Sequence, residues 1–244
     1  MQVYSPLGHK PGFGNLLMNL CVCKMQGVER IHRSVLDFEF GNCFIIHGFT
    51  IVDFEGDQPV CHTYINPSWH QFVWPLSRDI IKPTPHLQEL TKQHMHLLDG
   101  VTLGVNIRRG NYSEDSVQLS GTTEKKFFFC SDSGLAKFVQ AIDDAAGRVY
   151  VTSDSPSTKQ FLKNKFGEKV TMVDTVFAHT AEQTDPSSQT VKNLQDVYLV
   201  WYLLSLCPKV LCTGGTTDLV GFSTFGYMAA VYGSKPMEII FNGD

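Results

Sequence analysis

The sequence is poor in charged residues and has no excess of basic ones. Charged residues make up 18% of its 244 residues, and 24 acidic against 20 basic side chains give a formal net charge of -4. A nucleic-acid binder would show a basic surplus, so no nucleic-acid partner is expected. A disordered or fibrous chain is also excluded, because 43% of the residues are hydrophobic and supply a sizeable core.

The sequence also lacks the segments that mark membrane and secreted proteins. No apolar run approaches the roughly 18 residues that a bilayer span requires. The opening residues, Met1–Pro6, have neither the basic nor the apolar region of a secretion signal. Seven cysteines, an odd number in a core-rich chain, favour reduced thiols over disulfides. We expect a soluble, cytoplasmic globular protein without a membrane span.

Several motifs of known chemistry are missing as well. There is no three-glycine dinucleotide fingerprint, no Walker A loop and no G-x-S-x-G nucleophile elbow. Cys21 and Cys23 are two residues apart, as are His94 and His96, so in a helix the members of each pair would point to different faces. No metal site and no cofactor are therefore expected.

From residue 101 onward, short apolar runs alternate with amphipathic segments. Strands are predicted at Val101–Ile107, Arg148–Ser153, Lys169–Asp174 and Lys209–Thr213. Helices are predicted at Ser133–Ala146, Ser157–Phe166 and Val191–Leu206, with Asp132 or Ser133 as the N-cap of the first. This alternation predicts a parallel, doubly wound sheet in an α/β fold.

The first hundred residues are less regular. The elements predicted there are strands at Gln2–Ser5 and Cys43–Phe49, helices at Asn15–Gln26 and His86–Leu98, and a connector at Pro75–Pro85. The change in regularity predicts two α/β lobes, residues 1–99 and residues 100–244.

Two glycine-containing segments could bind phosphate groups. Gly8–Asn15 follows a predicted strand and opens a helix, and its glycines permit close approach of a ligand, although a plain strand–helix turn explains it equally. Thr213–Asp218, continued by Gly221–Gly226, places glycines and hydroxyls between a strand and a helix. Backbone N–H groups in such a turn form a natural phosphate cradle.

Two further segments lie at the carboxyl ends of predicted parallel strands, where open α/β sheets bind ligands. Arg108 and Arg109 follow the first strand, and guanidinium groups suit diphosphate recognition, although a solvated arginine pair is the alternative. Ser153 and Asp154 end the second strand and could hydrogen-bond a sugar or base, or cap the helix that begins near Ser157.

Taken in order, these four segments resemble the GT-B-type fucosyltransferases, particularly the α1,2-fucosyltransferases and their α1,6- and protein O-fucosyltransferase relatives. Pro11–Val22 is similar to that family's Gly-Gly-Leu-Gly-Asn and apolar helix. Asn106–Tyr112 resembles its His-Ile-Arg-Arg-Gly-Asp-Tyr motif, with Asn106 for the histidine and Asn111 for the aspartate. Val149–Asp154 is similar to its strand ending in Ser-Asp, and the segment from residue 196 to residue 225 to its helix, strand and Ser/Thr–Phe segment.

The resemblance implies two Rossmann-like lobes, with residues 1–99 on the acceptor side and residues 100–244 binding a nucleotide sugar. It implies metal-independent, inverting transfer of a 6-deoxy-L-hexose, foremost L-fucose from GDP-fucose, to a hydroxyl of a glycan acceptor. Arg108 and Arg109 would bind the diphosphate and stabilise the charge that develops as it leaves. The donor-binding residues it implies are Gly12, Gly14, Asn15, Asn106, Arg108, Arg109, Asp154, Gly214, Gly215, Thr216, Thr217 and Ser223.

An inverting reaction also needs a base on the acceptor side. Glu114 and Asp115, just past the arginine pair, are the first candidates, and His9 in the glycine turn is the second. Each is equally explained as a solvated loop residue.

The two asparagines in the arginine motif keep other functions open. One is transfer of another sugar, such as L-rhamnose, from a different nucleotide. Another is a non-catalytic relative that only binds a nucleotide or glycan. A Rossmann-type oxidoreductase is disfavoured by the missing three-glycine fingerprint.

Overall fold

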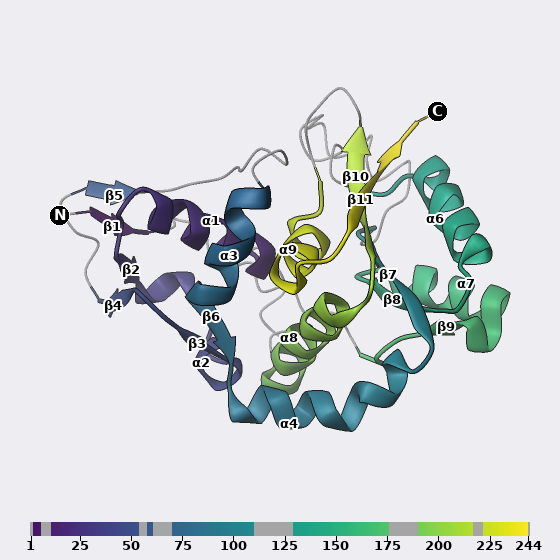
Figure 1. Ribbon diagram of the computed structural model, residues 1–244, viewed down its shortest axis with the longest axis horizontal. Helices are drawn as coiled ribbons and strands as arrows, with labels where there is room; N and C mark the ends of the chain where they lie inside the picture. The colour runs from purple at the N-terminus through teal and green to yellow at the C-terminus, as the bar shows by residue number, and fades with distance from the viewer. Residues whose placement is uncertain are drawn as a thin grey trace. The chain divides into compact units, whose positions relative to one another are not determined.

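The computed structural model describes residues 2–5, 11–53, 58–60, 70–109, 129–175, 190–216 and 222–243. The chain divides into two compact units, Met1–Lys92 with Ala178–Leu199 and Gln93–Phe177 with Val200–Asp244 (Figure 1). Helix α8 (Val191–Leu206) contributes residues to both units. The domain boundary between residues 99 and 100 remains a prediction. The predicted division has no segment like Ala178–Leu199, which belongs to the first unit.

The second unit is built on a five-stranded, all-parallel sheet with the order β11-β10-β7-β8-β9. Its strands are β7 (Val101–Ile107), β8 (Arg148–Ser153), β9 (Val170–Thr171), β10 (Val210–Thr216) and β11 (Met237–Asn242). The predicted parallel, doubly wound α/β architecture is confirmed. Strand β11 was not predicted, since it is an edge strand that is only half-buried and has no alternating pattern.

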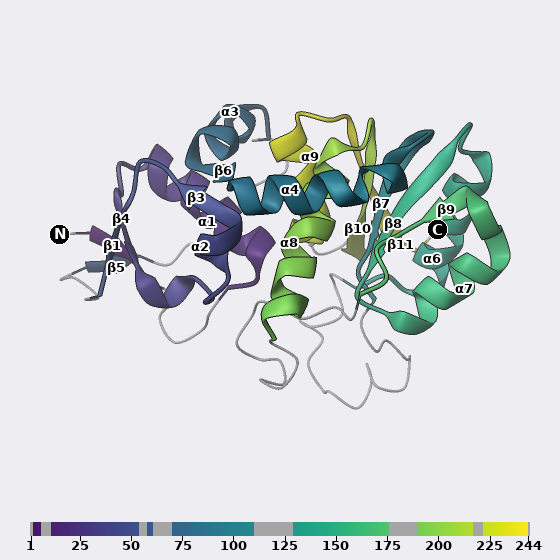
Figure 2. The same ribbon diagram turned by 90° about the horizontal axis from the view of Figure 1, so that it is seen from below.

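Alternation along β7 shows how helices cover both faces of this sheet (Figure 2). Leu103, Val105 and Ile107 belong to a core shared with residues of helices α6 (Asp132–Asp144) and α7 (Pro156–Phe166). Gly104 points to the other face, where a Cβ atom on it would lie 2.8 Å from Leu204 Cδ1 in helix α8. The glycine therefore lets α8 approach the strand closely.

The N-cap expected for the first helix of this unit is wrong by one residue or more. Ser131 caps α6, and its hydroxyl oxygen accepts a hydrogen bond from the Gly134 N–H at 3.1 Å. Asp132 lies in the first turn instead, where its negative charge suits the helix dipole. Ser155 caps α7 in the same manner, with its oxygen 3.3 Å from the Thr158 nitrogen.

The first unit contains a four-stranded parallel sheet with the order β4-β2-β1-β5 and a two-stranded antiparallel ribbon of β3 and β6. The strands are β1 (Gln2–Tyr4), β2 (Arg30–His32), β3 (Phe44–Ile46), β4 (Thr50–Val52), β5 (Gln58–Val60) and β6 (Ile81–Pro83). Strands β2, β4 and β5 were not predicted, because three residues are too few to establish a hydrophobic period.

The prediction of a connector at Pro75–Pro85 is wrong. Most of that range belongs to helix α3 (His70–Ile80) and strand β6. A proline inside a helix removes a backbone hydrogen bond. Ile80 and Ile81 are 1% and 0% exposed, and the packing of these two side chains offsets that loss. The residues next to Pro75 in the sequence do not reveal this packing.

The remaining described elements are three longer helices, α1, α4 and α9, and four short ones. They are α1 (Phe13–Met25), η1 (Arg33–Val35), α2 (Phe40–Cys43), α4 (Pro85–His94), η3 (Met95–Leu98), η5 (Gly167–Lys169) and α9 (Thr224–Gly233). Helices α1 and α4 correspond to the predicted helices at Asn15–Gln26 and His86–Leu98. Gly100 follows η3 with φ 69°, a conformation that suits glycine at the end of a helical segment.

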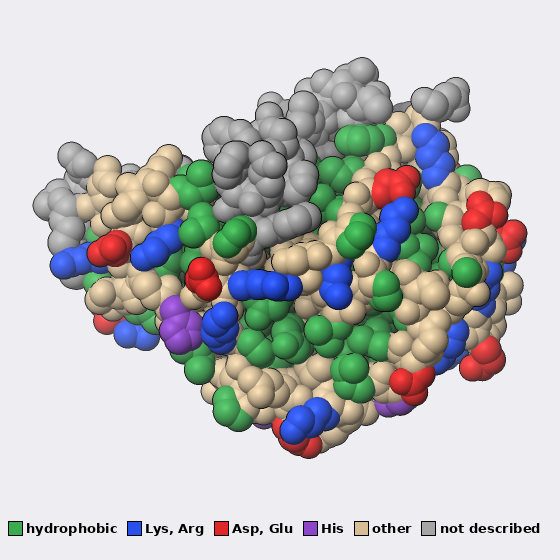
Figure 3. Space-filling view, in the orientation of Figure 1, with side chains coloured by type: hydrophobic (Ala, Val, Ile, Leu, Met, Phe, Trp, Pro, Cys, Tyr) green, Lys and Arg blue, Asp and Glu red, His purple; other side chains and the backbone are tan. Residues whose placement is uncertain are grey.

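The surface and the thiols match a core-rich chain of low net charge. Basic and acidic side chains are interspersed on the face drawn in Figure 3. The cysteines in the described ranges are free and buried. Within those ranges, every helix is too short or too polar to cross a membrane.

An aromatic cluster in the first unit surrounds one buried carboxylate. The rings of Phe13, Phe40 and Phe44 lie 4.9 to 5.9 Å from the ring of Tyr198 in α8. The Tyr198 hydroxyl donates a hydrogen bond to Asp37 Oδ2, and the carboxyl is 7% exposed. Burial, and next the nearby carboxylate, raise the pKa of Tyr198, so the hydroxyl stays protonated as the donor.

We predict that Tyr198→Phe lowers the free energy of unfolding by about 1–3 kcal/mol, because it leaves a buried carboxylate oxygen without that donor. Tyr202→Phe is the matched control, since Tyr202 lies one turn further along the same helix and is half-buried. Denaturant unfolding of both variants measures the difference. Equal losses in the two would contradict an energetic role for the Tyr198–Asp37 bond.

Candidate functional site

The strand order of the second unit reverses between β7 and β10. From β7 the chain builds β8 and β9 on one side, then crosses to place β10 and β11 on the other. In open α/β sheets, ligands bind at the carboxyl ends of the strands beside such a switch point. Arg108 and Arg109 leave β7 at this edge, Asp154 leaves β8, and Thr213 lies near the end of β10. The sequence correctly placed all of these segments at one edge.

Asn106 connects four chain segments at the switch point. Its Nδ2 donates to Thr152 Oγ1 of β8 at 2.9 Å, and its Oδ1 accepts from the Ser223 hydroxyl before α9 at 2.9 Å. Its backbone oxygen accepts from the Thr213 hydroxyl of β10 at 3.0 Å. Thr213 Oγ1 in turn accepts the backbone N–H of Arg108 at 2.9 Å. One asparagine therefore fixes where the arginine segment begins.

This network is buried and its members satisfy one another. Asn106 is 4% exposed, Ser223 3% and Thr213 0%. Ser223 occupies the N-cap position of α9, where its side chain makes no cap hydrogen bond, and its hydroxyl donates to Asn106 Oδ1. Buried networks of this kind fix geometry when every member has a partner. Donor binding by Asn106 and Ser223 stays a prediction.

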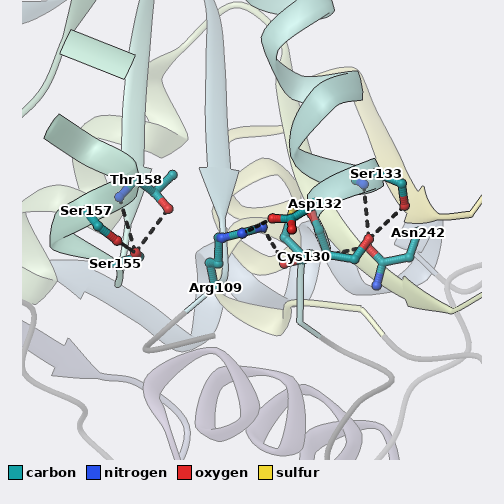
Figure 4. Close-up of polar contacts among 10 residues, drawn as sticks. Arg109, Cys130, Asp132, Ser133, Ser155, Ser157, Thr158 and Asn242 are labelled. Atoms are coloured by element: carbon teal, nitrogen blue, oxygen red, sulfur yellow. Dashed lines mark hydrogen bonds and ion pairs between the residues drawn. The ribbon is translucent and has the colours of Figure 1, made fainter. Parts of the chain in front are cut away.

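The two arginines have different surroundings. The Arg109 guanidinium donates from Nη1 to the backbone oxygen of Cys130 at 3.2 Å and forms an ion pair through Nη2 with Asp132. Figure 4 shows it directed toward the start of α6 and away from the hydroxyls of Ser155 and Thr158. Its side chain is 13% exposed. Arg109 therefore holds the segment that enters α6.

The Arg108 side chain is more exposed than that of Arg109. Its Nη1 lies 3.6 Å from Asp154 Oδ2, its Cζ lies 5.3 Å from the centre of the Phe129 ring, and the side chain is 25% exposed. Burial lowers the pKa of Arg108 and the Asp154 carboxylate opposes that shift, so the guanidinium stays charged. Of the pair, Arg108 has the more exposed side chain, and its guanidinium lies beside the Asp154 carboxylate.

Asp154 contacts both arginines. Its Oδ1 accepts the backbone N–H of Arg109 at 2.7 Å, while Oδ2 faces the Arg108 guanidinium. Neither Ser153 nor Asp154 is the N-cap of α7, because Ser155 occupies that position. Ser153 Oγ accepts the Ser155 N–H at 3.2 Å and so orients that cap.

The predicted glycine and threonine residues lie in three places. Gly214 allows β11 to pack closely, because a Cβ atom on it would lie 2.6 Å from Phe241 Cδ1. Gly215 is buried and Thr216 is the last residue of β10. In the first unit, Gly12 is the N-cap of α1, Gly14 is buried in its first turn and Asn15 is exposed. His9, Glu114, Asp115 and Thr217 lie outside the described residues.

Two residues beside Arg108 escaped the sequence analysis. The ring of Phe129 lies against Arg108, with its centre 5.3 Å from the arginine Cζ. Asn242, at the end of β11, donates from Nδ2 to the Phe129 backbone oxygen at 2.7 Å and accepts the Ser131 N–H at 2.8 Å. A signal existed, since Asn242 follows the short apolar run Ile239–Phe241, which is compatible with a strand ending at the same edge.

No cluster of three or more His, Cys, Asp or Glu side chains that could hold a metal ion occurs in the part of the chain that the structure describes. Cofactor binding is not tested by this geometry.

Solved structures with a similar fold include NodZ, an α1,6-fucosyltransferase. The chain matches NodZ co-crystallised with GDP at a TM-score of 0.54 and 14% identity, covering 93% of this chain and 91% of that one. NodZ soaked with GDP-fucose matches at 0.54 and 13%, covering 95% and 92%. NodZ from Bradyrhizobium matches at 0.52 and 14%, covering 93% and 91%. The chain has a GT-B-like fold.

The GT-B-like fold confirms the architecture that the sequence resemblance implied. No protein-family model matches the chain, and no curated protein sequence matches it. At this identity the likeness establishes the fold alone, because one fold can support many different reactions.

We predict that Gly226→Ala in α9 disturbs this GT-B-like site. An added Cβ atom would lie 2.7 Å from the Cβ atoms of Asn106 and Cys212, which cannot move without their backbones. The overpacking costs about 1–3 kcal/mol, which exceeds the gain of about 1 kcal/mol from alanine in a helix.

Gly41→Ala in α2 is the matched control, because nothing lies within 4 Å of its added Cβ. Denaturant unfolding should show a loss of stability for Gly226→Ala alone. A Gly226→Ala protein as stable as the control would show that α9 does not rest on Asn106.

Proposed function

We propose that the protein is a glycosyltransferase that moves a 6-deoxy-L-hexose, L-fucose from GDP-fucose, to a hydroxyl of a glycan acceptor. The observation that carries the proposal is the position of Arg108 at the switch point of the second unit, with its backbone held by Thr213, its guanidinium beside Asp154 and its side chain 25% exposed. The GT-B-like fold, shared with a fucosyltransferase that was co-crystallised with GDP and soaked with GDP-fucose, supports this choice of donor.

Arg108 would bind the donor diphosphate and stabilise it as a leaving group. In the proposed step, the acceptor hydroxyl oxygen bonds to C1 of the sugar while the bond from C1 to the diphosphate oxygen breaks. Negative charge then builds on the diphosphate, where a fixed guanidinium stabilises the transition state more than the ground state. A single displacement of this kind inverts the configuration at C1.

The acceptor proton must pass to a base in the same step. Glu114, Asp115 and His9 remain the candidates, and transfer without a metal remains part of the proposal. Gly214, Gly215 and Thr216, at the end of β10, are proposed to contact the donor through backbone groups. Donor contact by Gly12, Gly14, Asn15 and Thr217 stays a prediction from the sequence. The Arg109 guanidinium is bound by Asp132 and by the backbone oxygen of Cys130. Arg109 is therefore proposed to affect donor binding indirectly, by holding neighbouring residues in place.

We predict that Arg108→Ala lowers kcat for transfer by about 100- to 1000-fold, as for the loss of one charge-stabilising donor. Arg33→Ala is the matched control, since Arg33 is an exposed arginine of the first unit that pairs with Asp53. Transfer of labelled fucose from GDP-fucose to a glycan mixture measures both. Full activity of Arg108→Ala would exclude the proposed role.

The donor is tested separately by thermal stability. A nucleotide that binds only the folded state raises Tm with its concentration. We predict a larger rise with GDP and GDP-fucose than with UDP, TDP or their sugars. A rise with TDP-rhamnose alone would assign the rhamnose donor instead. Nucleotide binding without transfer or donor hydrolysis for any sugar would assign a non-catalytic binder.

A further inference from the structure

Asp154 lies at the carboxyl end of β8 with both carboxylate oxygens directed at the arginine segment. Its side chain is 7% exposed, with Oδ1 2.7 Å from the Arg109 nitrogen and Oδ2 3.6 Å from Arg108 Nη1. We propose that Asp154 is a positioning residue that holds Arg108 ready for a diphosphate and at the same time weakens the binding of that diphosphate. The proposal rests on the proposed function for the identity of the anion.

The contacts of Asp154 favour this role over direct contact with the donor. A carboxylate that hydrogen-bonds a sugar or base must turn an oxygen toward it. Oδ1 of Asp154 accepts the Arg109 N–H, and Oδ2 lies at ion-pair distance from the Arg108 guanidinium. A buried carboxylate beside a diphosphate also repels it, so its presence there needs a function that outweighs the repulsion.

Placing Arg108 is such a function. The Asp154 carboxylate and the Phe129 ring both lie against its guanidinium, and the Thr213 hydroxyl accepts its backbone N–H. Asn242 fixes the Phe129 backbone from β11. A guanidinium held before the ligand arrives meets the leaving group in one geometry.

The same carboxylate reduces the attraction for the ligand. Asp154 offsets the desolvation of Arg108 and thereby stabilises its charge, as the opposed directions of these two effects on the pKa of Arg108 indicate. Its own negative charge nonetheless subtracts from the positive potential that an approaching diphosphate experiences. Affinity and positioning therefore depend on Asp154 with opposite signs.

Asp154→Asn separates the two effects. The amide keeps the shape and an oxygen that can accept the Arg109 N–H, but removes the charge that holds Arg108. We expect inorganic pyrophosphate to bind at least about threefold more tightly in calorimetry, because a nearby negative charge is gone. We expect kcat for fucosyl transfer to fall by about tenfold or more, because Arg108 is no longer fixed.

Asp154→Glu and Asp53→Asn complete the set. The glutamate keeps the charge and displaces it, so kcat should fall without tighter pyrophosphate binding. Asp53→Asn removes an exposed carboxylate that pairs with Arg33 and should change neither quantity. Melting temperatures of all variants show whether each is folded, and Asp154→Glu keeps the proposal testable if Asp154→Asn is not.

The outcomes are distinguishable. Unchanged or weaker pyrophosphate binding by Asp154→Asn, tighter binding by Asp154→Glu, or no pyrophosphate binding by the unaltered protein would each overturn the role of Asp154. An unchanged kcat in Asp154→Asn would also overturn it. The expected pyrophosphate pattern with no sugar transfer by the unaltered protein would overturn the proposed function and leave the positioning of Arg108 in place.

Discussion

The site depends on one buried side chain, the Asn106 amide. A primary amide offers donors and an acceptor, and here they are used by Thr152 and Ser223 from different segments. Because these groups are sealed from water, losing one partner would leave another unsatisfied, and the segments are held as a unit. The fucosyltransferase motif that Asn106–Tyr112 resembles has a histidine at this position. In this chain the asparagine is used for bracing within the sheet edge.

The arrangement of charge follows from that brace. Once the Arg108 backbone is fixed to Thr213, the two consecutive arginines must leave the strand in different directions. Arg109 is directed to Asp132 and the entrance of α6, where it stabilises local structure. Arg108 stays at the strand edge with Asp154 beside it and a quarter of its side chain exposed. Each of the two guanidinium groups therefore lies beside a carboxylate, Asp154 for Arg108 and Asp132 for Arg109.

Helix α9 reaches the same edge by close packing. Gly226 allows its backbone to rest on Asn106 and Cys212, which brings Ser223 within hydrogen-bonding distance of the amide. The helix begins without a side-chain cap. Helix α9 thus lacks one stabilising cap hydrogen bond, while Ser223 is held in the site by Asn106. Such a compromise is common where structure serves a ligand.

The sequence by itself determined the α/β architecture of the second unit, because period-2 apolar runs and amphipathic helices there are long enough to show their patterns. It also placed Arg108, Asp154 and the Thr213 segment at one sheet edge, since the carboxyl ends of parallel strands must lie together. Only the tertiary structure decided that the two arginines differ, that Asp154 faces them, and that Asn106 is buried. These properties depend on contacts between residues 23 to 117 positions apart, such as Arg109 with Asp132 and Asn106 with Ser223, which no local pattern encodes.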